Sequence, residues 1–332
     1  MKPISRRHIL TQLPLGIAGA VSLGFPFTSL AQSAYPNRLV RVVVPWPAGG
    51  LVDIPARILC QRLQQIFGQP FVVENKLGAG GSIGADAVAK SPADGHHLLF
   101  STSALSFNVA MKSKVPFDFL RDLEAVSHLA QAPSILVVGP SIQANNVQEL
   151  IQLARSKPGR LSYGSAGIGS PAHLTGELFK SLQNLFIVHI PYTGAPAAIN
   201  DQLAGRIDFQ FANAAVALPQ VRAGKMKALA VTGNQRFSAL PLVPTMVEAG
   251  VPHFEADQWL GLFAPKGLPK SISDRLNDEI NKLLSQEDFK AEIVKAGVIV
   301  ASPIKANAFD QTIRNEINKW SGVVKTANIQ PE

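Results

Sequence analysis

Short β-rich runs alternate with helical patterns along most of the chain, and this alternation limits the fold more than any other feature. Strands separated by helical segments form sheets whose neighbouring strands run parallel, with helices on both faces. We therefore predict an α/β protein with parallel sheets. The predicted strands lie at 39–44, 71–74, 97–101, 134–139, 161–165, 186–190, 207–211 and 227–232, and the helices at 53–66, 82–90, 147–156, 171–183, 195–204 and 215–223.

From Pro269 the pattern becomes mostly helical. Two sheets joined by crossing segments fit a chain of 332 residues better than one very wide sheet does. Crossings are expected near residues 130–133 and 254–263. The first lobe would then contain residues 32–130 and 256–332, and the second lobe residues 131–255. A ligand cleft between the lobes follows from this layout.

Residues 1–31 are typical of a bacterial export signal. Lys2, Arg6 and Arg7 precede an apolar stretch at 9–27, and small residues precede a cut after Ala31. Residues 5–10 also resemble a twin-arginine signal, and a general secretory route stays open. A membrane anchor fits less well, because proline and glycine interrupt the stretch. No later apolar run reaches the ~18–20 residues that span a bilayer, so a periplasmic location is predicted.

The composition excludes several classes of protein and several kinds of site. The hydrophobic fraction of 46% excludes wholesale disorder. Cys60 is the single cysteine, so neither an internal disulfide nor a thiolate metal cluster is possible. The net charge is +8, but the basic residues are scattered and three lie in the leader, which argues against nucleic-acid binding. The histidines lack the spacing of metal ligands. We expect no metal and no cofactor.

Four loops lie where a predicted strand ends and a helix begins, the place where α/β sheets bind ligands. The first, 45–53, contains Gly49 and Gly50, whose amides no side chain shields, and Asp53, which is expected to cap the helix. The second, 74–84, has a glycine spacing one residue too long for a dinucleotide fingerprint. The next strand ends in Ser101 and Thr102 rather than in an acid, so a dinucleotide is not expected.

The third loop, 163–171, contains Ser165, and the fourth, 189–196, contains Tyr192. A hydrolase nucleophile elbow needs glycine two residues before its serine, but Tyr163 stands there. Ser165 is therefore predicted to donate a hydrogen bond to an anion, although a secreted hydrolase using Ser165 remains a rival. Exposed amides at helix starts bind carboxylate or phosphate. No paired carboxylates occur in these loops, so a binding protein is favoured over an enzyme.

With these loops in view, the sequence resembles the Bug family, the extracytoplasmic solute receptors of tripartite tricarboxylate transporters. The match runs from Tyr35 to the C-terminus. It is carried, in the family's order, by VPWPAGG at 44–50 with Asp53, VEN at 73–75, GAGG at 78–81, ADG at 93–95, YGS at 163–165, GS at 169–170, PY at 191–192, AGK at 223–225, PT at 244–245, and Trp259.

The resemblance implies a two-lobed periplasmic-binding-protein fold of the Venus flytrap type, which closes on a small carboxylate. It also implies delivery of that ligand to an integral-membrane permease, and we expect the receptor to be a monomer. A sensor that presents the ligand to a signalling membrane partner is the alternative. Carried over, the ligand contacts are Trp46, Ala48, Gly49, Gly50, Leu51, Val52, Ser82, Ser101 and Thr102 in one lobe, and Ser165, Ala166, Ser170, Tyr192 and Asn213 in the other.

The sequence departs from the family's usual pattern at three places. Trp46 replaces a more usual Phe, Lys76 and Leu77 replace an Arg-Pro pair, and His96 and His97 replace a Tyr-Thr pair. The larger indole of Trp46 would narrow the pocket or stack on an aromatic acid. The ligands of the family are therefore not assumed for this chain.

Overall fold

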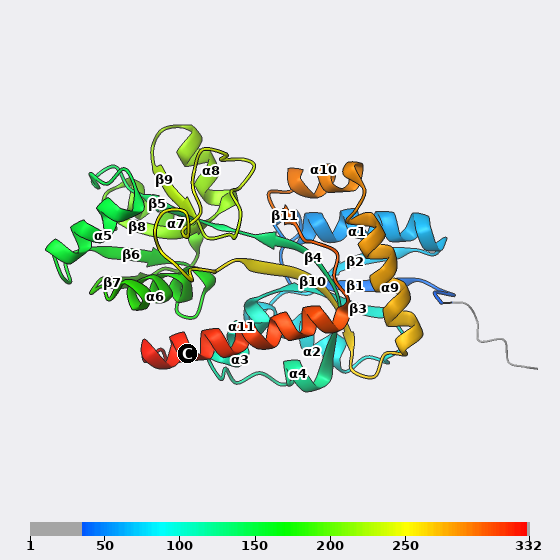
Figure 1. Ribbon diagram of the computed structural model, residues 1–332. Coiled ribbons are helices and arrows are strands. Elements are labelled where there is room, and N and C mark those ends of the chain that lie inside the picture. The colour runs from blue at the N-terminus through cyan, green and yellow to red at the C-terminus, as the bar shows by residue number, and fades with distance from the viewer. Residues whose placement is uncertain (1–34, 331–332) are drawn as a thin grey trace, which may run out of the picture. The chain divides into compact units, whose positions relative to one another are not determined.

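Two β-sheets organise residues 35–330, the part of the chain that the computed structural model describes (Figure 1). The predicted export signal at 1–31 lies outside the described residues. The first sheet has the strand order β11-β4-β10-β3-β1-β2 and the second the order β7-β6-β8-β5-β9. The strands are β1 (Val40–Val44), β2 (Phe71–Asn75), β3 (His97–Thr102), β4 (Leu123–Ala132), β5 (Ser134–Val138), β6 (Ser162–Ser165), β7 (Val188–Pro191), β8 (Phe209–Asn213), β9 (Lys227–Val231), β10 (Gln258–Pro265) and β11 (Ile299–Val300).

The prediction of parallel sheets is wrong, because both sheets are mixed. β1 pairs in parallel with β2 and β3, and β6 pairs in parallel with β7 and β8. By contrast, β10 is antiparallel to β3 and β4, and β5 is antiparallel to β8 and β9. The parallel pairs come from strand–helix–strand units. In the first sheet β10 and β11 run opposite to the other four strands, and in the second sheet β5 runs opposite to the other four. Of these reversed strands, β5 and β10 each follow a passage of the chain from one sheet to the other.

The chain passes between the sheets at two places. Pro133 alone separates β4 of the first sheet from β5 of the second. The return runs from β9 in the second sheet to β10 in the first, and β4 and β10 lie side by side along their lengths (Figure 1). We call the part built on the first sheet the first lobe and the part built on the second sheet the second lobe. The lobe boundaries at residues 32–130 with 256–332 and at residues 131–255 stay a prediction.

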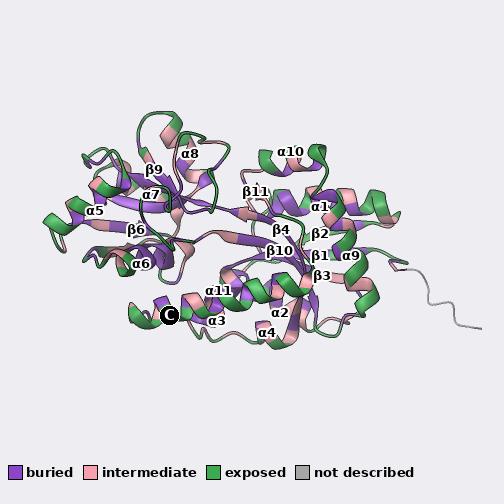
Figure 2. Cartoon of the chain, viewed as in Figure 1, coloured by how far each residue is buried: buried purple, intermediate pink, exposed green. Residues whose placement is uncertain are grey.

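Helices cover both faces of each sheet. The strands are largely buried, while the outer faces of the helices are exposed (Figure 2). Cys60 lies in the core of the first lobe and is only 3% exposed. The helices are α1 (Asp53–Phe67), the 3-10 helix η1 (Ala79–Gly81), α2 (Ser82–Ala89), α3 (Ala104–Ala110), α4 (Phe119–Asp122), α5 (Val147–Ser156), α6 (Pro171–Gln183), α7 (Ala195–Leu203), α8 (Ala214–Arg222), α9 (Lys270–Leu283), α10 (Glu287–Lys295) and α11 (Ala306–Thr326).

The C-terminal helix α11 contributes to the cores of both lobes. Phe309 and Ile313 pack with residues of the first sheet, such as Phe263. About two turns after Ile313, Trp320 belongs to a core cluster that contains Leu178 and Phe179 of α6 in the second lobe. Its ring also meets that of Phe107 in α3 edge to face, at 5.2 Å between centroids. A helix thus links the lobes in addition to the two crossing segments (Figure 1).

Candidate ligand site

A cavity of about 290 Å³ lies between the two lobes, where strands end and helices begin. No lysine, arginine, histidine, aspartate or glutamate side chain is among its described lining residues. Any charge on a ligand must therefore be balanced by uncharged donors and helix dipoles. The lining consists of Trp46, Pro47, Gly50, Leu51, Val52, Thr102, Ala104, Ala132, Gln258 and Leu260 from the first lobe, and Ser134, Ala166, Ser170, Pro171, Ala172, Ala195, Gln210, Phe211, Ala212 and Asn213 from the second.

Asp53 organises the first loop, although it does not cap the helix as predicted. The N-cap residue is Val52, whose backbone already has helical angles, and Asp53 is the first residue inside α1. Its carboxylate accepts hydrogen bonds from the Gly49 amide at 2.8 Å and from Arg57 Nε at 2.7 Å. It also accepts from Asn75 Nδ2 at 2.8 Å. Burial favours the neutral acid, but these bonds outweigh burial and hold the pKa of Asp53 below its usual value.

The glycine amides of this loop are therefore not open to a ligand in the way the sequence suggests. The Gly49 N–H is bound by Asp53, and the Gly50 N–H donates to Pro47 O at 3.2 Å. Gly49 has a φ of +74°, which requires glycine in the turn. Gly50 lines the cavity, whereas Ala48 and Gly49 are exposed outside it.

The second lobe directs three helix starts at the cavity. Ser170 caps α6 by accepting from the His173 N–H at 3.3 Å, and Asn213 caps α8 by accepting from the Val216 N–H at 3.3 Å. Ala195 is the first residue of α7. The first turns of these helices contain no acidic residue, so their partial positive charge is not already compensated. The first turn of α1, in contrast, contains Asp53.

Eight of the predicted ligand contacts lie together at the cavity, and six do not. Those that line it are Trp46, Gly50, Leu51, Val52, Thr102, Ala166, Ser170 and Asn213. Outside it, Ser82 is buried and accepts from Asn108 Nδ2 at 3.1 Å, and Ser101 is buried within β3. Tyr192 lines another depression, which shares Ala166 with the cavity, and its hydroxyl donates to Asp201 at 2.9 Å. The role of all these residues in ligand binding stays a prediction.

Ser165 is also outside the cavity, although it lies beside a histidine. Its Oγ is 2.7 Å from His189 Nε2, accepts from the Gly167 N–H and lies 3.0 Å from Gly167 O. The residue is completely buried, and the His189 ring stacks on His173 at 3.9 Å between centroids. Burial, together with the neighbouring His173 and Lys180, lowers the pKa of His189 to about 3. The pair thus supports the loop before α6 and does not face the cavity.

Several cavity residues were missed from the sequence. Gln210 and Phe211 lie in β8 just before Asn213. In a buried strand the sequence pattern does not distinguish residues that face a ligand cavity from residues of the core. Gln258 begins β10. The return crossing expected near residues 254–263 is the sequence signal that places Gln258 between the lobes. His96 and His97, the departures from the family pattern, lie near the start of β3, whereas Thr102 at its end reaches the cavity.

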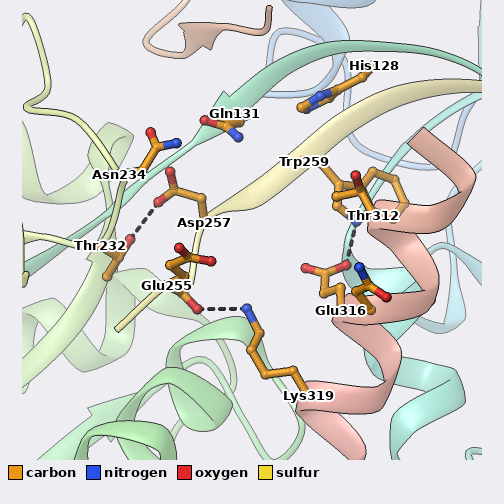
Figure 3. A pocket seen from close by; sticks show the side chains of 11 residues that line it. His128, Gln131, Thr232, Asn234, Glu255, Asp257, Trp259, Thr312, Glu316 and Lys319 are labelled. Atoms are coloured by element: carbon orange, nitrogen blue, oxygen red, sulfur yellow. Dashed lines mark hydrogen bonds between the residues drawn. The ribbon is translucent and has the colours of Figure 1, made fainter. Parts of the chain in front are cut away.

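A second cavity, of about 310 Å³, lies between the crossing strands and α11 (Figure 3). Thr232 donates to Asp257 Oδ1 at 3.0 Å, and Trp259 Nε1 donates to Glu316 Oε2 at 2.5 Å. Lys319 donates to the Glu255 carbonyl at 2.8 Å. Burial raises the pKa of Asp257 to about 6 despite its bond from Thr232. These contacts tie the return crossing to the second sheet and to the C-terminal helix.

Two further features bear on function. Among residues 35–330 no group of three or more histidine, cysteine, aspartate or glutamate side chains is arranged to hold a metal ion. Within the same residues no helix has both the length and the apolar character needed to span a bilayer.

The sequence model of the tripartite tricarboxylate transporter family receptor matches residues 55–329. The chain belongs to this family. Protein BugT of Bordetella pertussis is a relative of this receptor, 37% identical over 300 residues, which cover 89% of this chain and 91% of BugT. The resemblance to the Bug receptors is therefore confirmed.

Solved structures of similar proteins confirm the two-lobed fold of this receptor. Rpa4515 of R. palustris, described with adipate, superposes with a TM-score of 0.77 at 33% identity and covers 90% of this chain and 100% of its own. MatC of Rhodopseudomonas palustris, described with bound malate, gives a TM-score of 0.71 at 31% identity and covers 87% of this chain and 100% of its own.

Proposed function

We propose that this receptor captures a small carboxylate in the periplasm by closing its two lobes, and that it delivers the acid to the membrane permease of a tripartite tricarboxylate transporter. The observation that carries the proposal is the uncharged cavity onto which the starts of α6, α7 and α8 open. The ligands described with Rpa4515 and MatC, adipate and malate, are both carboxylates, which supports the same class here.

Helix starts explain how a site without cations can bind an anion. The first amides of a helix have no acceptor within the helix and carry partial positive charge. Ser170 and Asn213 add donors, because capping uses Ser170 Oγ and Asn213 Oδ1 only as acceptors. Each charge-assisted hydrogen bond contributes about 1.5–3 kcal/mol. Several such bonds offset the cost of immobilising a small acid and support binding in the micromolar range.

The two predicted lobes are residues 32–130 with 256–332 and residues 131–255. If they move as units, closure would turn them about the crossing at Pro133 and about the return segment that leads into β10. The cavity is lined from both sides, so a bound acid would contact both lobes at once. The free energy of those contacts would favour the closed state. We expect the receptor to do this as a monomer.

Calorimetry on ligand-stripped protein tests the binding step. Asn213→Asp keeps a good cap but places a negative charge at the helix start, so affinity for every acid should fall at least about tenfold. Asn146→Asp is the matched control, because Asn146 caps α5 in the same way, accepting from the Glu149 N–H at 2.9 Å, away from the cavity. A wild-type protein that binds no mono-, di- or tricarboxylate would contradict the proposal.

Uptake by cells tests the delivery step separately. Deleting the gene for this receptor should abolish high-affinity uptake of the acid that calorimetry identifies. Unchanged uptake combined with lost induction of the acid's transport genes would instead support the sensor that the sequence left open. The two readings share the cavity and differ only in the membrane partner.

A further inference from the structure

The two segments that carry the chain between the sheets each place one polar side chain in the ligand cavity. Ser134 begins β5 directly after Pro133, and Gln258 begins β10 at the return. Gln258 lies across from Ala132 in the register of β10 with β4, and Ser134 follows Ala132 by two residues. Because Ala132, Ser134 and Gln258 all line the cavity, the two polar side chains are neighbours where the lobes join.

Both side chains have hydrogen-bonding groups to spare. Among residues 35–330 neither the Ser134 hydroxyl nor the Gln258 side-chain amide has a hydrogen-bond partner, although Ser134 is only 2% exposed. The backbone of Ser134 is fixed, because its N–H donates to Thr232 Oγ1 at 2.8 Å and its carbonyl accepts from the Thr232 N–H at 2.9 Å. A buried hydroxyl without a partner costs free energy, which a ligand that bonds to it recovers.

A helix start lies next to Ser134. In the antiparallel pair of β5 with β8, Ser134 is directly opposite Asn213, which caps α8. Side chains of directly opposite residues lie on the same face of a sheet, with Cβ atoms about 4.5–5.5 Å apart. A carboxylate bound at the start of α8 therefore has its neighbouring carbon atoms within reach of Ser134 and Gln258.

The hydrogen-bonding chemistry of Ser134 and Gln258 matches a hydroxyl group. Serine and glutamine side chains both donate and accept, whereas a carboxylate only accepts and a methylene group does neither. A ligand hydroxyl can accept from Ser134 while it donates to the Gln258 carbonyl. An ammonium group would also donate, but no acidic side chain is among the described lining residues to balance its charge.

We infer that the cavity selects hydroxycarboxylates, with the carboxylate at the starts of α6 and α8 and a nearby hydroxyl group bound by Ser134 and Gln258. This inference rests on the proposed function and names the chemical class of its ligand. It makes Ser134 and Gln258, two residues not expected from the sequence to contact the ligand, the residues that determine specificity.

Calorimetry on ligand-stripped protein with matched acids tests the inference. Malate is compared with succinate and aspartate, lactate with propanoate and alanine, and citrate with tricarballylate. In each series the hydroxyl group is kept, removed or, in the amino acids, replaced by an ammonium group. In every series that binds, the hydroxy acid should bind at least about tenfold more tightly than its analogues, because they leave Ser134 and Gln258 unpaired or bury an unbalanced charge.

Ser134→Ala identifies the residue responsible. It should weaken binding of the hydroxy acid about tenfold and change binding of the analogue without the hydroxyl less than about threefold. Gln258→Met keeps the length of the side chain and should act in the same direction. Ser127→Ala is the matched control, because Ser127 is also a strand serine with an unpartnered hydroxyl, 1% exposed, but lies in β4 outside the cavity. It should change no affinity.

Equal or tighter binding of the analogues would overturn the inference and leave the proposed function intact. An equal loss of affinity for both members of a pair in Ser134→Ala would also overturn it. Absence of binding by any acid would instead overturn the proposed function, and the inference with it.

Discussion

The carboxylate of Asp53 accepts a hydrogen bond of 2.8 Å from the backbone N–H of Gly49, four residues earlier in the chain. A loop that looks open in the sequence is therefore closed on itself by an acid from the helix that follows. The acid binds the amide that a ligand was expected to use. The loop then contributes shape and apolar surface, through Trp46 and Leu51, more than it contributes donors.

Asp53→Asn should destabilise the protein by about 2–3 kcal/mol, because it leaves buried donors without their charged acceptor. Asp310→Asn is the matched control. Both acids pair with an arginine four residues later at 2.7 Å, but the side chain of Asp53 is 1% exposed and that of Asp310 is 38% exposed. The control should change stability by less than about 1 kcal/mol. Urea unfolding measures both, and equal effects would contradict this account.

Gly49→Ala distinguishes the role of Gly49 in the turn from its role in ligand binding. Gly49 and Gly267 have φ values of +74° and +92°, and a Cβ at either position would meet no atom within 4 Å. Alanine at either site should therefore cost a similar ~1–2 kcal/mol of stability through backbone strain alone. Only Gly49→Ala should also weaken acid binding, because that loop lines the cavity. Binding unaffected by Gly49→Ala would show that the loop tolerates strain without moving Trp46 or Gly50.

Asp257→Asn should make the protein more stable at pH 8 but not at pH 4. An unfolded aspartate loses its proton near pH ~3.9, whereas burial raises the pKa of Asp257 to about 6 in the folded protein. Between these values the unfolded chain ionises first, so wild-type stability falls as pH rises. Removing the acid should recover about 1–3 kcal/mol above pH 6.

Urea unfolding at the two pH values measures this difference. Asp274→Asn, an exposed acid 2.6 Å from Lys270, serves as control and should have little effect at either pH. A gain of the same size at pH 4 and pH 8 would mean that the ionisation of Asp257 is not its cause.

Ser165→Ala tests the hydrolase that the sequence left as a rival. We expect no ester or amide turnover by the wild-type protein, because Ser165 is buried outside the cavity. The variant should lose about 1–2 kcal/mol of stability, since the Gly167 N–H and His189 lose their partner. Acid affinity should fall at most a few-fold. Turnover in the wild type that disappears in the variant would overturn this reading.

The sequence predicts regular elements well where periodicity and capping agree. Helix α6 spans Pro171–Gln183, as predicted, because Ser170 and Pro171 mark its start and Asn184 adopts a left-handed conformation at its end. Helix α3 (Ala104–Ala110) was missed. Its side chains are mostly buried on several faces, so it lacks the amphipathic period that reveals a helix.

Strand direction and donor availability were harder to predict. The pattern of β5 and β10 is that of any buried strand, and only the passage between sheets makes them antiparallel. For Asp53 the residue type suggested a cap, but the helical backbone of Val52 moves the helix start by one residue. The residues near the cavity could be predicted from their types. The hydrogen bonds that already occupy their backbone N–H groups could not, because those bonds depend on three-dimensional contacts.

Helix α11 has a mechanical consequence. It lies against the crossing segment, where Glu316 and Lys319 bond to Trp259 and Glu255. Its buried residues Phe309 and Trp320, eleven positions apart on one continuous helix, belong to the cores of the two lobes. A helix of fixed length held at both ends resists twisting of one lobe against the other more than it resists bending. We therefore expect any movement of the lobes to be mainly a bend about the crossing strands, limited by how far α11 can flex.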